Sequence, residues 1–232
     1  MELKFLGIGG AFNPLKGNTS AYFKENNELF LIDCGENIFT RIIEKNILED
    51  IKSINIMVTH LHSDHIGSIS TLIDYAYYIL KIPVYIITSN IIEYDIASLL
   101  NYTGITKEKY SFKDVTEYTN YKSFNSIKYI KTSHVIKLAS YSLIFETNRG
   151  IIYYSGDTKE LNTLKSLLNN NLYKAYIDTN SSNNPANTHV YIGDLIETVD
   201  NKYKDKIYCM HINDNKCMEM IKESGFNIVE TN

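Results

Sequence analysis

Short apolar runs alternate along the chain with segments in which apolar residues recur every three or four positions. The first pattern predicts buried strands, and the second predicts helices with one apolar face. The expected strands are 3–8, 19–23, 29–32, 54–58, 84–87, 127–132, 141–146, 151–155, 175–178 and 207–210. The expected helices are 37–48, 66–80, 91–100, 160–168, 190–199 and 216–223.

The order of these elements predicts an α/β fold. Strands cluster at the start of each half of the chain, and helices separate the later strands. Two sheets packed against each other with helices outside would satisfy this order, so we expect a four-layer αββα sandwich. No linker, repeat or low-complexity tract interrupts the pattern, and we therefore expect one domain over residues 1–232.

The composition narrows the class of protein. Hydrophobic residues make up 44% and charged residues 22%, which is typical of a globular chain with a buried core. The net charge of −4 argues against broad, sequence-independent binding to nucleic acid. Three cysteines give no disulfide framework, and neither a secretion signal nor an apolar run of membrane-spanning length is present. We expect a cytoplasmic protein without a membrane partner.

The most informative segment is His-Leu-His-Ser-Asp-His, which begins directly after the apolar run 54–58 and one threonine. His60, His62, Asp64 and His65 place four ligand-type side chains within six residues. Imidazole nitrogens and carboxylate oxygens suit zinc or manganese. A chance group of surface histidines is the competing interpretation, but three of the six histidines of the chain lie in this window.

This motif resembles the signature of the metallo-β-lactamase superfamily. Residues 1–11, 17–20 and 31–36 are similar to the amino-terminal half of ribonuclease Z and its relatives, and Ser-Gly-Asp-Thr at 155–158 resembles the later aspartate motif of that group. The resemblance covers most of the chain and implies the superfamily's sandwich fold and hydrolytic chemistry.

Carried over position by position, the resemblance implies two bound divalent metal ions, most typically zinc. The first ion would be bound by His60, His62 and His134, and the second by Asp64, His65 and His211, with Asp157 bridging the two. Isolated histidines at strand ends are often structural, and an aspartate in a Gly-Asp-Thr turn can be a helix N-cap. The β-lactamases of the superfamily tend to have a cysteine near the bridging position, so an aspartate there favours the phosphodiesterase branch.

Three residues are expected to act in catalysis. In relatives of ribonuclease Z, a histidine at the position of His189 protonates the leaving oxygen, and a carboxylate fixes the tautomer of its ring. Asp178 lies where that family usually has glutamate. Asp64 is expected to serve as a ligand and as a catalytic residue. The competing interpretations are a surface histidine at a helix start for His189 and an ordinary strand-end residue for Asp178.

The interval between His134 and Asp157 points to a small substrate. It spans 23 positions (157 minus 134), is filled by an expected strand pair and leaves no room for the arm with which tRNA-processing relatives grip tRNA. The chain thus resembles the phosphodiesterases without this arm, including phage anti-Pycsar enzymes. We expect hydrolysis of a small cyclic nucleotide, in the host cytoplasm if the chain is phage-encoded. The alternatives are a tRNA 3′-processing endonuclease, a lactonase or thioesterase, and a non-enzymatic metal- or nucleotide-binding protein.

Two further expectations concern the surroundings of the motif. Asp33 lies within an apolar run, and we expect it to hydrogen-bond the metal-binding loop from outside the ligand set; turn formation is the alternative. Gly9 and Gly10 are expected to form a tight turn beside the site rather than to bind phosphate alone.

The remaining expectations concern tyrosines and assembly. Tyr75, Tyr77 and Tyr78 are expected in a helix core rather than stacked on a base. Because related enzymes often form dimers in which one subunit covers the site of its neighbour, we expect a homodimer. The segment 101–124 is either such a lid or contact, or a plain surface excursion.

Overall fold

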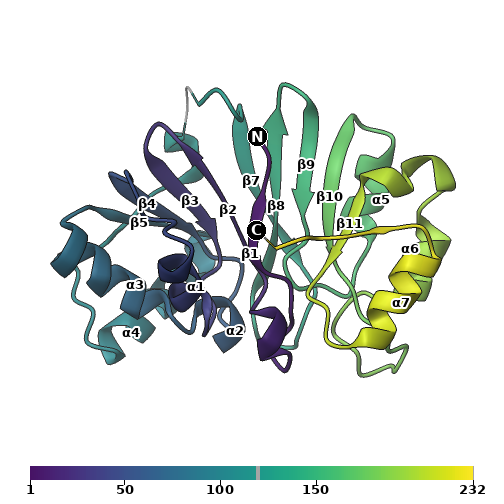
Figure 1. Ribbon diagram of the computed structural model, residues 1–232, viewed down its shortest axis with the longest axis horizontal. Helices are drawn as coiled ribbons and strands as arrows, with labels where there is room; N and C mark the ends of the chain where they lie inside the picture. Colours follow the sequence, from purple (N-terminus) through teal and green to yellow (C-terminus); the bar gives the residue numbers. More distant parts are fainter. Residues whose placement is uncertain (119–120, 232) are drawn as a thin grey trace.

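The computed structural model describes residues 1–118 and 121–231. Within them the chain forms two six-stranded sheets that face each other (Figure 1). The first sheet contains, in this order, β1 (Lys4–Gly7), β2 (Ser20–Glu25), β3 (Glu28–Ile32), β4 (Ser53–Met57), β5 (Val84–Ile87) and β6 (Ser111–Phe112). The second contains β7 (Ser126–Thr132), β8 (Ser140–Thr147), β9 (Gly150–Tyr154), β10 (Leu172–Asp178), β11 (Ile207–Met210) and β12 (Asn227–Ile228).

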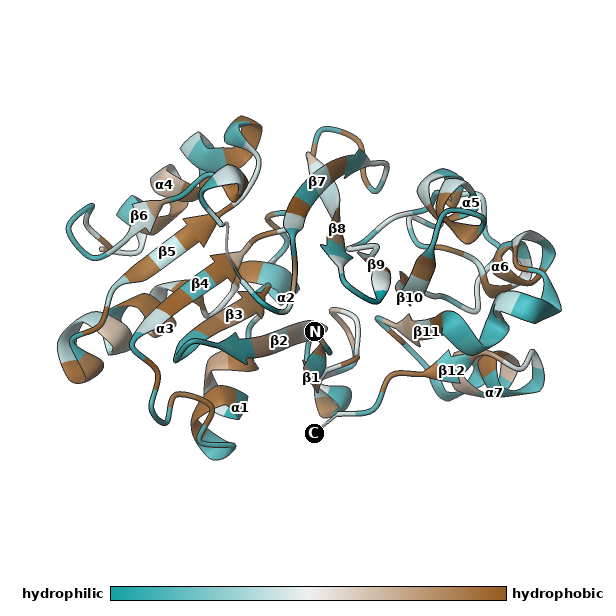
Figure 2. Cartoon of the chain, turned by 90° about the horizontal axis from the view of Figure 1, so that it is seen from above, coloured by the Kyte–Doolittle hydropathy of each residue, from teal (hydrophilic) through white to brown (hydrophobic). Residues whose placement is uncertain are grey.

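Both sheets follow the same pairing plan. In each, the first two pairings are antiparallel and the next three are parallel. Figure 2 shows the two sheets from above, the first on the left and the second on the right. Since parallel strands end at the same edge, β3 to β5 deliver their carboxyl ends to one place, as do β9 to β11.

Helices cover the outer face of each sheet. The first half contributes α1 (Ile38–Glu44), α2 (Ser63–Ile66), α3 (Ile69–Tyr75), a π-helical turn (Ala76–Leu80) and α4 (Asn90–Tyr102). The second contributes α5 (Asn162–Leu168), α6 (Ile192–Thr198) and α7 (Asn215–Glu223). Short 3₁₀ turns occupy Pro14–Lys16, Val115–Glu117 and Asn201–Lys206. In Figure 1, α1, α3 and α4 lie on one side of the strands, and α5, α6 and α7 on the other.

Three apolar cores lie between the four layers of sheets and helices and hold them together. One lies between the first sheet and its helices, and another between the second sheet and its helices. The third lies between the sheets, where the Phe23 and Phe30 rings stack with centroids 4.6 Å apart and Phe145 of the other sheet meets Phe23 edge-on. The predicted αββα sandwich is confirmed.

The largest differences from the expected element boundaries lie in the first half. The helix expected over 37–48 ends at Glu44, and the one expected over 66–80 divides into α2, α3 and the π-helical turn. The two-residue strands β6 and β12 were missed because so short a run carries no periodicity.

The expectation that Tyr77 and Tyr78 lie in a helix core is wrong. Their exposed fractions are 38% and 53%, whereas the neighbouring Ala76 is fully buried. The π-helical turn places Ala76 on the sheet side and turns both rings outward. The Lys109 ammonium lies 4.7 Å from the centroid of the Tyr78 ring, so a cation–π contact replaces core packing there.

The segment 101–124 packs mainly on its own sheet. Tyr102 is exposed at the end of α4, but Tyr118 is buried and its hydroxyl donates to Asn55 Oδ1 at 2.7 Å. Tyr121 donates to Glu28 Oε1 at 3.0 Å. Positions 119–120 of the segment lie outside the described residues. Within the described ranges, none of the helices is long and apolar enough to cross a membrane.

Candidate metal centre

The seven side chains that the resemblance assigned to metal binding converge at the edge where the parallel strands end. They come from the loops that follow four different strands. His60, His62, Asp64 and His65 follow β4, His134 follows β7, Asp157 follows β9, and His211 follows β11. All except His62 are buried. Their potential ligand atoms form two groups of four that share Asp157.

The first group joins three imidazoles to one carboxylate. His62 Nδ1 lies 3.1 Å from His60 Nε2 and 3.2 Å from His134 Nε2. Asp157 Oδ2 lies 3.8 Å from His60 Nε2 and 3.6 Å from His134 Nε2. The four atoms surround one point, as the ligands of a single ion do.

The second group lies on the other side of the shared carboxylate. Asp157 Oδ1 is 3.2 Å from His65 Nε2, and Asp157 Oδ2 is 3.3 Å from His211 Nε2. Asp64 Oδ2 completes the group at 3.3 Å from His211 Nε2 and 3.5 Å from His65 Nε2. Two imidazoles and two carboxylates therefore face a second point.

The chemistry of this donor set fits divalent cations. His65 Nδ1 lies 2.8 Å from Asp33 Oδ2, so it carries the ring proton that this carboxylate accepts. His65 Nε2 is buried without a hydrogen-bond partner among the described residues and faces Asp157 Oδ1. Burial opposes a charged ring, but the Asp157 and Asp33 carboxylates outweigh it and raise the pKa of His65 in the metal-free protein. A ring nitrogen and a carboxylate oxygen this close need a positive charge between them, which a proton supplies in the metal-free protein and a divalent cation would supply when bound.

Asp33 hydrogen-bonds the loop that carries His60 and His65 without being one of the seven potential ligands, as expected from the sequence. It is fully buried and adopts a left-handed backbone, with φ of 60°. Its Oδ1 accepts from the Thr59 backbone N–H at 2.8 Å, and its Oδ2 accepts from the Thr59 hydroxyl at 2.7 Å. Burial raises the pKa of Asp33 against the opposing effect of His65. Thr59 also accepts a hydrogen bond from His60 Nδ1 at 3.1 Å, so one network orients two rings.

His134 is oriented by the chain on the opposite side. Its Nδ1 donates to the backbone carbonyl of Thr188 at 2.9 Å, which leaves Nε2 directed at the first group. Because Thr188 directly precedes His189, the same segment fixes a potential ligand and carries the predicted acid.

His189 belongs to neither of these two groups, but with Asp178 it forms a third cluster of potential ligand atoms that also contains Asp157 and His211. Its Nδ1 donates to Asp178 Oδ2 at 2.8 Å and lies 3.9 Å from Asp157 Oδ2. Its side chain is 17% exposed, in contrast to the fully buried Asp178. Burial disfavours the charged ring, but the Asp178 carboxylate outweighs burial and raises the pKa of His189 to about 9. The ring is therefore charged near neutral pH.

Gly10 allows the amino-terminal loop to approach the centre. A Cβ at this position would lie 2.2 Å from Asn213 Oδ1 and 2.8 Å from His211 Cε1. The Asn13 backbone N–H donates to the Gly10 carbonyl at 3.1 Å, which closes a tight turn that begins at Gly10. A side chain at position 10 would displace the ring of His211.

Sequence reasoning missed three residues that orient this site. They are Thr59, Thr158 and Thr188, which act through a hydroxyl, a backbone N–H and a backbone carbonyl. Each directly precedes or follows a predicted site residue in the sequence, and that adjacency is the one signal that marks them.

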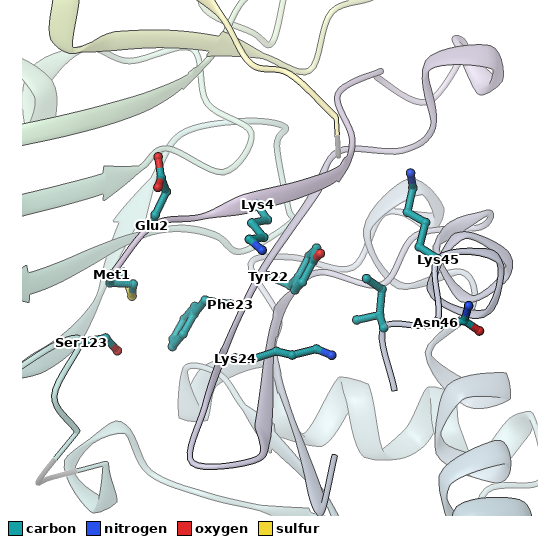
Figure 3. Close-up of a pocket in the computed structure, with 10 residues that line it drawn as sticks. Met1, Glu2, Lys4, Tyr22, Phe23, Lys24, Lys45, Asn46 and Ser123 are labelled. Atoms are coloured by element: carbon teal, nitrogen blue, oxygen red, sulfur yellow. The ribbon is translucent and has the colours of Figure 1, made fainter. Parts of the chain in front are cut away.

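One hollow in the described structure borders this centre, and another lies apart from it. One of about 440 Å³ borders His134 and is lined by three lysines, Lys131, Lys137 and Lys159, with no acidic side chain among its lining. A second, of about 390 Å³, lies where β1 and β2 meet the end of α1, and none of the seven side chains lines it (Figure 3). The first hollow is therefore the one that bears on the chemistry of the centre.

Comparison with known proteins identifies the family. The model of the family described as anti-Pycsar protein Apyc1 matches residues 1–232. The Apyc1 protein of Bacillus phage BSP38 is 26% identical over 236 residues, which cover 92% of this chain and 90% of that protein. Ribonuclease Z of Methanococcus maripaludis is 40% identical over 67 residues, which cover 28% of this chain and 21% of that enzyme.

Solved structures agree on the fold. The metallo-β-lactamase fold protein YhfI of Bacillus subtilis superposes with a TM-score of 0.73 at 14% identity, covering 96% of this chain and 90% of that one. The chain therefore belongs to the anti-Pycsar Apyc1 family, and its fold is that of the metallo-β-lactamase hydrolases.

Proposed function

We propose that the protein is a two-metal phosphodiesterase that opens the ring of a cyclic nucleotide. The observation that carries the proposal is the position of Asp157, which belongs to both groups of potential ligands and lies 3.9 Å from the charged ring of His189. Two cation sites beside a proton donor are the parts that hydrolysis of a phosphodiester needs.

The donor atoms favour zinc, with manganese as the alternative. Five of the seven side chains offer imidazole nitrogen and two offer carboxylate oxygen, and the chain's three cysteines lie elsewhere. Bound there, divalent cations would activate the attacking water and neutralise negative charge on the phosphoryl oxygens. In the metal-free protein the His211 and His65 rings outweigh burial and lower the pKa of Asp64, so this carboxylate is ionised there.

The chain's own residues supply the proton for the leaving group. A water oxygen adds to phosphorus and the water loses a proton to solvent, one ester P–O bond breaks, and the departing sugar oxygen takes a proton from His189, which solvent then protonates again. Asp178 holds Nδ1 of that ring, which leaves Nε2 as the nitrogen that delivers the proton. The product is a nucleoside monophosphate, with no further co-reactant than water.

Three observations support a small substrate. The interval between His134 and Asp157 is filled by a loop and by the hairpin of β8 and β9, with no projecting arm. The hollow beside His134 carries three lysines, a charge suited to a phosphate. The full-length relative is named for action against Pycsar, whereas the match to ribonuclease Z is confined to 67 residues. A homodimer, and action in a host cytoplasm, stay predictions.

One panel of substrates tests the proposal. The purified protein, loaded with zinc or with manganese, is incubated with cyclic mononucleotides, cyclic dinucleotides, bis-p-nitrophenyl phosphate and precursor tRNA. We expect metal-dependent opening of a cyclic nucleotide. Cleavage of tRNA alone would instead establish the processing endonuclease. Hydrolysis of lactones or thioesters that survives His189→Ala, without phosphodiesterase activity, would establish the remaining enzymatic alternative.

A further inference from the structure

We infer that Asp178 positions two histidines with different tasks, His189 as the acid and His211 as a metal ligand. This inference rests on the proposed function and adds to it a direct link between proton delivery and one cation site. Asp178 itself touches neither the substrate nor a cation in this scheme, so it is a positioning residue.

The two oxygens of Asp178 have different surroundings. Oδ2 accepts two hydrogen bonds, from His189 Nδ1 at 2.8 Å and from the Thr158 backbone N–H at 3.0 Å. Oδ1 is buried without a hydrogen-bond partner among the described residues and lies 3.5 Å from His211 Nδ1. His211 Nδ1 is itself buried and without such a partner.

These two atoms are complementary in the metal-loaded protein. His211 Nε2 faces the second group, 3.3 Å from Asp64 Oδ2 and 3.3 Å from Asp157 Oδ2. If Nε2 binds a cation, the ring proton must reside on Nδ1, and a buried N–H requires an acceptor. Asp178 Oδ1 is the carboxylate oxygen that the structure places opposite it, so a shift of a few tenths of an ångström forms the bond.

Other rings of the centre follow the same rule. His65 directs Nδ1 at Asp33, and His134 directs Nδ1 at the Thr188 carbonyl. Outer partners of this kind fix the tautomer and raise the basicity of the ligating nitrogen. His211 lacks any other acceptor at Nδ1 among the described residues, which assigns Asp178 to this role in addition to its bond with His189.

The test compares Asp178→Asn with His189→Ala. If Asp178 acts through both histidines, Asp178→Asn weakens zinc affinity by about 10- to 100-fold in competition with a chromogenic chelator. His189→Ala removes the acid and leaves zinc affinity at the wild-type value. The unfolding temperature of the zinc-free variants controls for folding.

The leaving group provides a second readout. Loss of an acid matters most for an unactivated sugar oxygen, so His189→Ala should lower turnover of a cyclic nucleotide far more than turnover of bis-p-nitrophenyl phosphate. Asp178→Asn should lower both, because it disturbs a cation site as well. Asp178→Glu, which keeps the carboxylate, should recover more zinc affinity than Asp178→Asn does.

The wild-type protein gives an answer even if the variants fold poorly. In the zinc-loaded protein, nitrogen-15 NMR should show His211 Nδ1 protonated and slow to exchange its proton with water. Wild-type zinc affinity in Asp178→Asn, or a His211 Nδ1–H that exchanges as fast as an exposed one, would overturn the inference. Weakened zinc binding in Asp178→Asn with no hydrolysis of any phosphodiester by the wild type would instead overturn the proposed function alone.

Discussion

The pair β3 and β4 in the first half and the pair β9 and β10 in the second are equivalent in strand order, but they use a buried aspartate differently. In the first half the carboxylate belongs to the end of β3, where Asp33 binds the backbone of Thr59 beyond β4. In the second half it ends β10, where Asp178 binds the backbone of Thr158 beyond β9. Each aspartate also accepts from the Nδ1 of one histidine.

The two aspartates differ in whether a carboxylate oxygen remains without a hydrogen-bond partner after these shared bonds. Both oxygens of Asp33 are occupied, because Thr59 donates to it twice and His65 once. Asp178 retains an unused oxygen and binds a histidine that is partly exposed. A carboxylate whose two oxygens both accept hydrogen bonds stabilises the fold, whereas one with a free oxygen can also interact with a group that takes part in the reaction. We therefore expect Asp33 to matter most for stability and Asp178 for turnover.

Replacing each aspartate with asparagine in the metal-free protein should separate the two roles. Asp33→Asn leaves an amide group facing the Thr59 hydroxyl and His65 Nδ1, which both donate, and should cost about 2–3 kcal/mol. In Asp178→Asn the amide oxygen can take the place of Oδ2 and keep the hydrogen bonds from Thr158 and His189, so the loss should be smaller, below about 1 kcal/mol. Urea unfolding with excess chelator measures both, and equal losses would contradict the distinction.

The pH profile sharpens the role of the second aspartate. His189 must be protonated to act as the acid, and its pKa is raised to about 9 by Asp178 against the effect of burial. Activity on a cyclic nucleotide should therefore fall on the alkaline side, by about tenfold per pH unit beyond that pKa. Bound cations repel the charged ring and move this limb toward neutral pH, so metal content is held constant.

Asp178→Asn should move the alkaline limb to lower pH, because the carboxylate that stabilises the charged ring is gone. The measurement is kcat/KM against pH for wild type and variant. An unchanged limb would show that another group delivers the proton.

For zinc binding, the smallest effects are expected at the two threonines. The Thr59 hydroxyl donates to Asp33 and accepts from His60, whereas the Thr158 hydroxyl binds the loop at Ser133 and leaves the contact with Asp178 to its backbone. Thr59→Val should cost about 1 kcal/mol of stability and weaken zinc binding. Thr158→Val should leave zinc affinity unchanged. A larger effect of Thr158→Val on zinc would reverse the comparison.

Much of the fold was predictable because it is encoded over short distances, whereas the convergence of His134, Asp157 and His211 on the first motif was implied by the family resemblance. Apolar periodicity located the long strands, and four potential ligands in six residues announced the centre without any tertiary information. The lone aspartate of an apolar run, Asp33, was also interpretable, since a buried carboxylate needs donors.

The rest depends on contacts between distant segments. No local pattern indicates that His134 donates to the carbonyl of residue 188, or that one carboxylate lies between His189 and His211. The outward turn of Tyr77 and Tyr78 arises from a π-helical turn that apolar spacing does not reveal. Metal identity and substrate choice also depend on the arrangement of distant segments, so no local sequence pattern specifies them.

The backbone at position 211 restricts how this centre can change. His211 has a φ of 59°, a conformation that asparagine, aspartate and histidine tolerate better than other residues with a side chain. An oxygen ligand such as aspartate at this position is therefore compatible with the backbone, whereas cysteine meets backbone strain there. The sheet edge thus limits the inorganic chemistry that this scaffold can acquire.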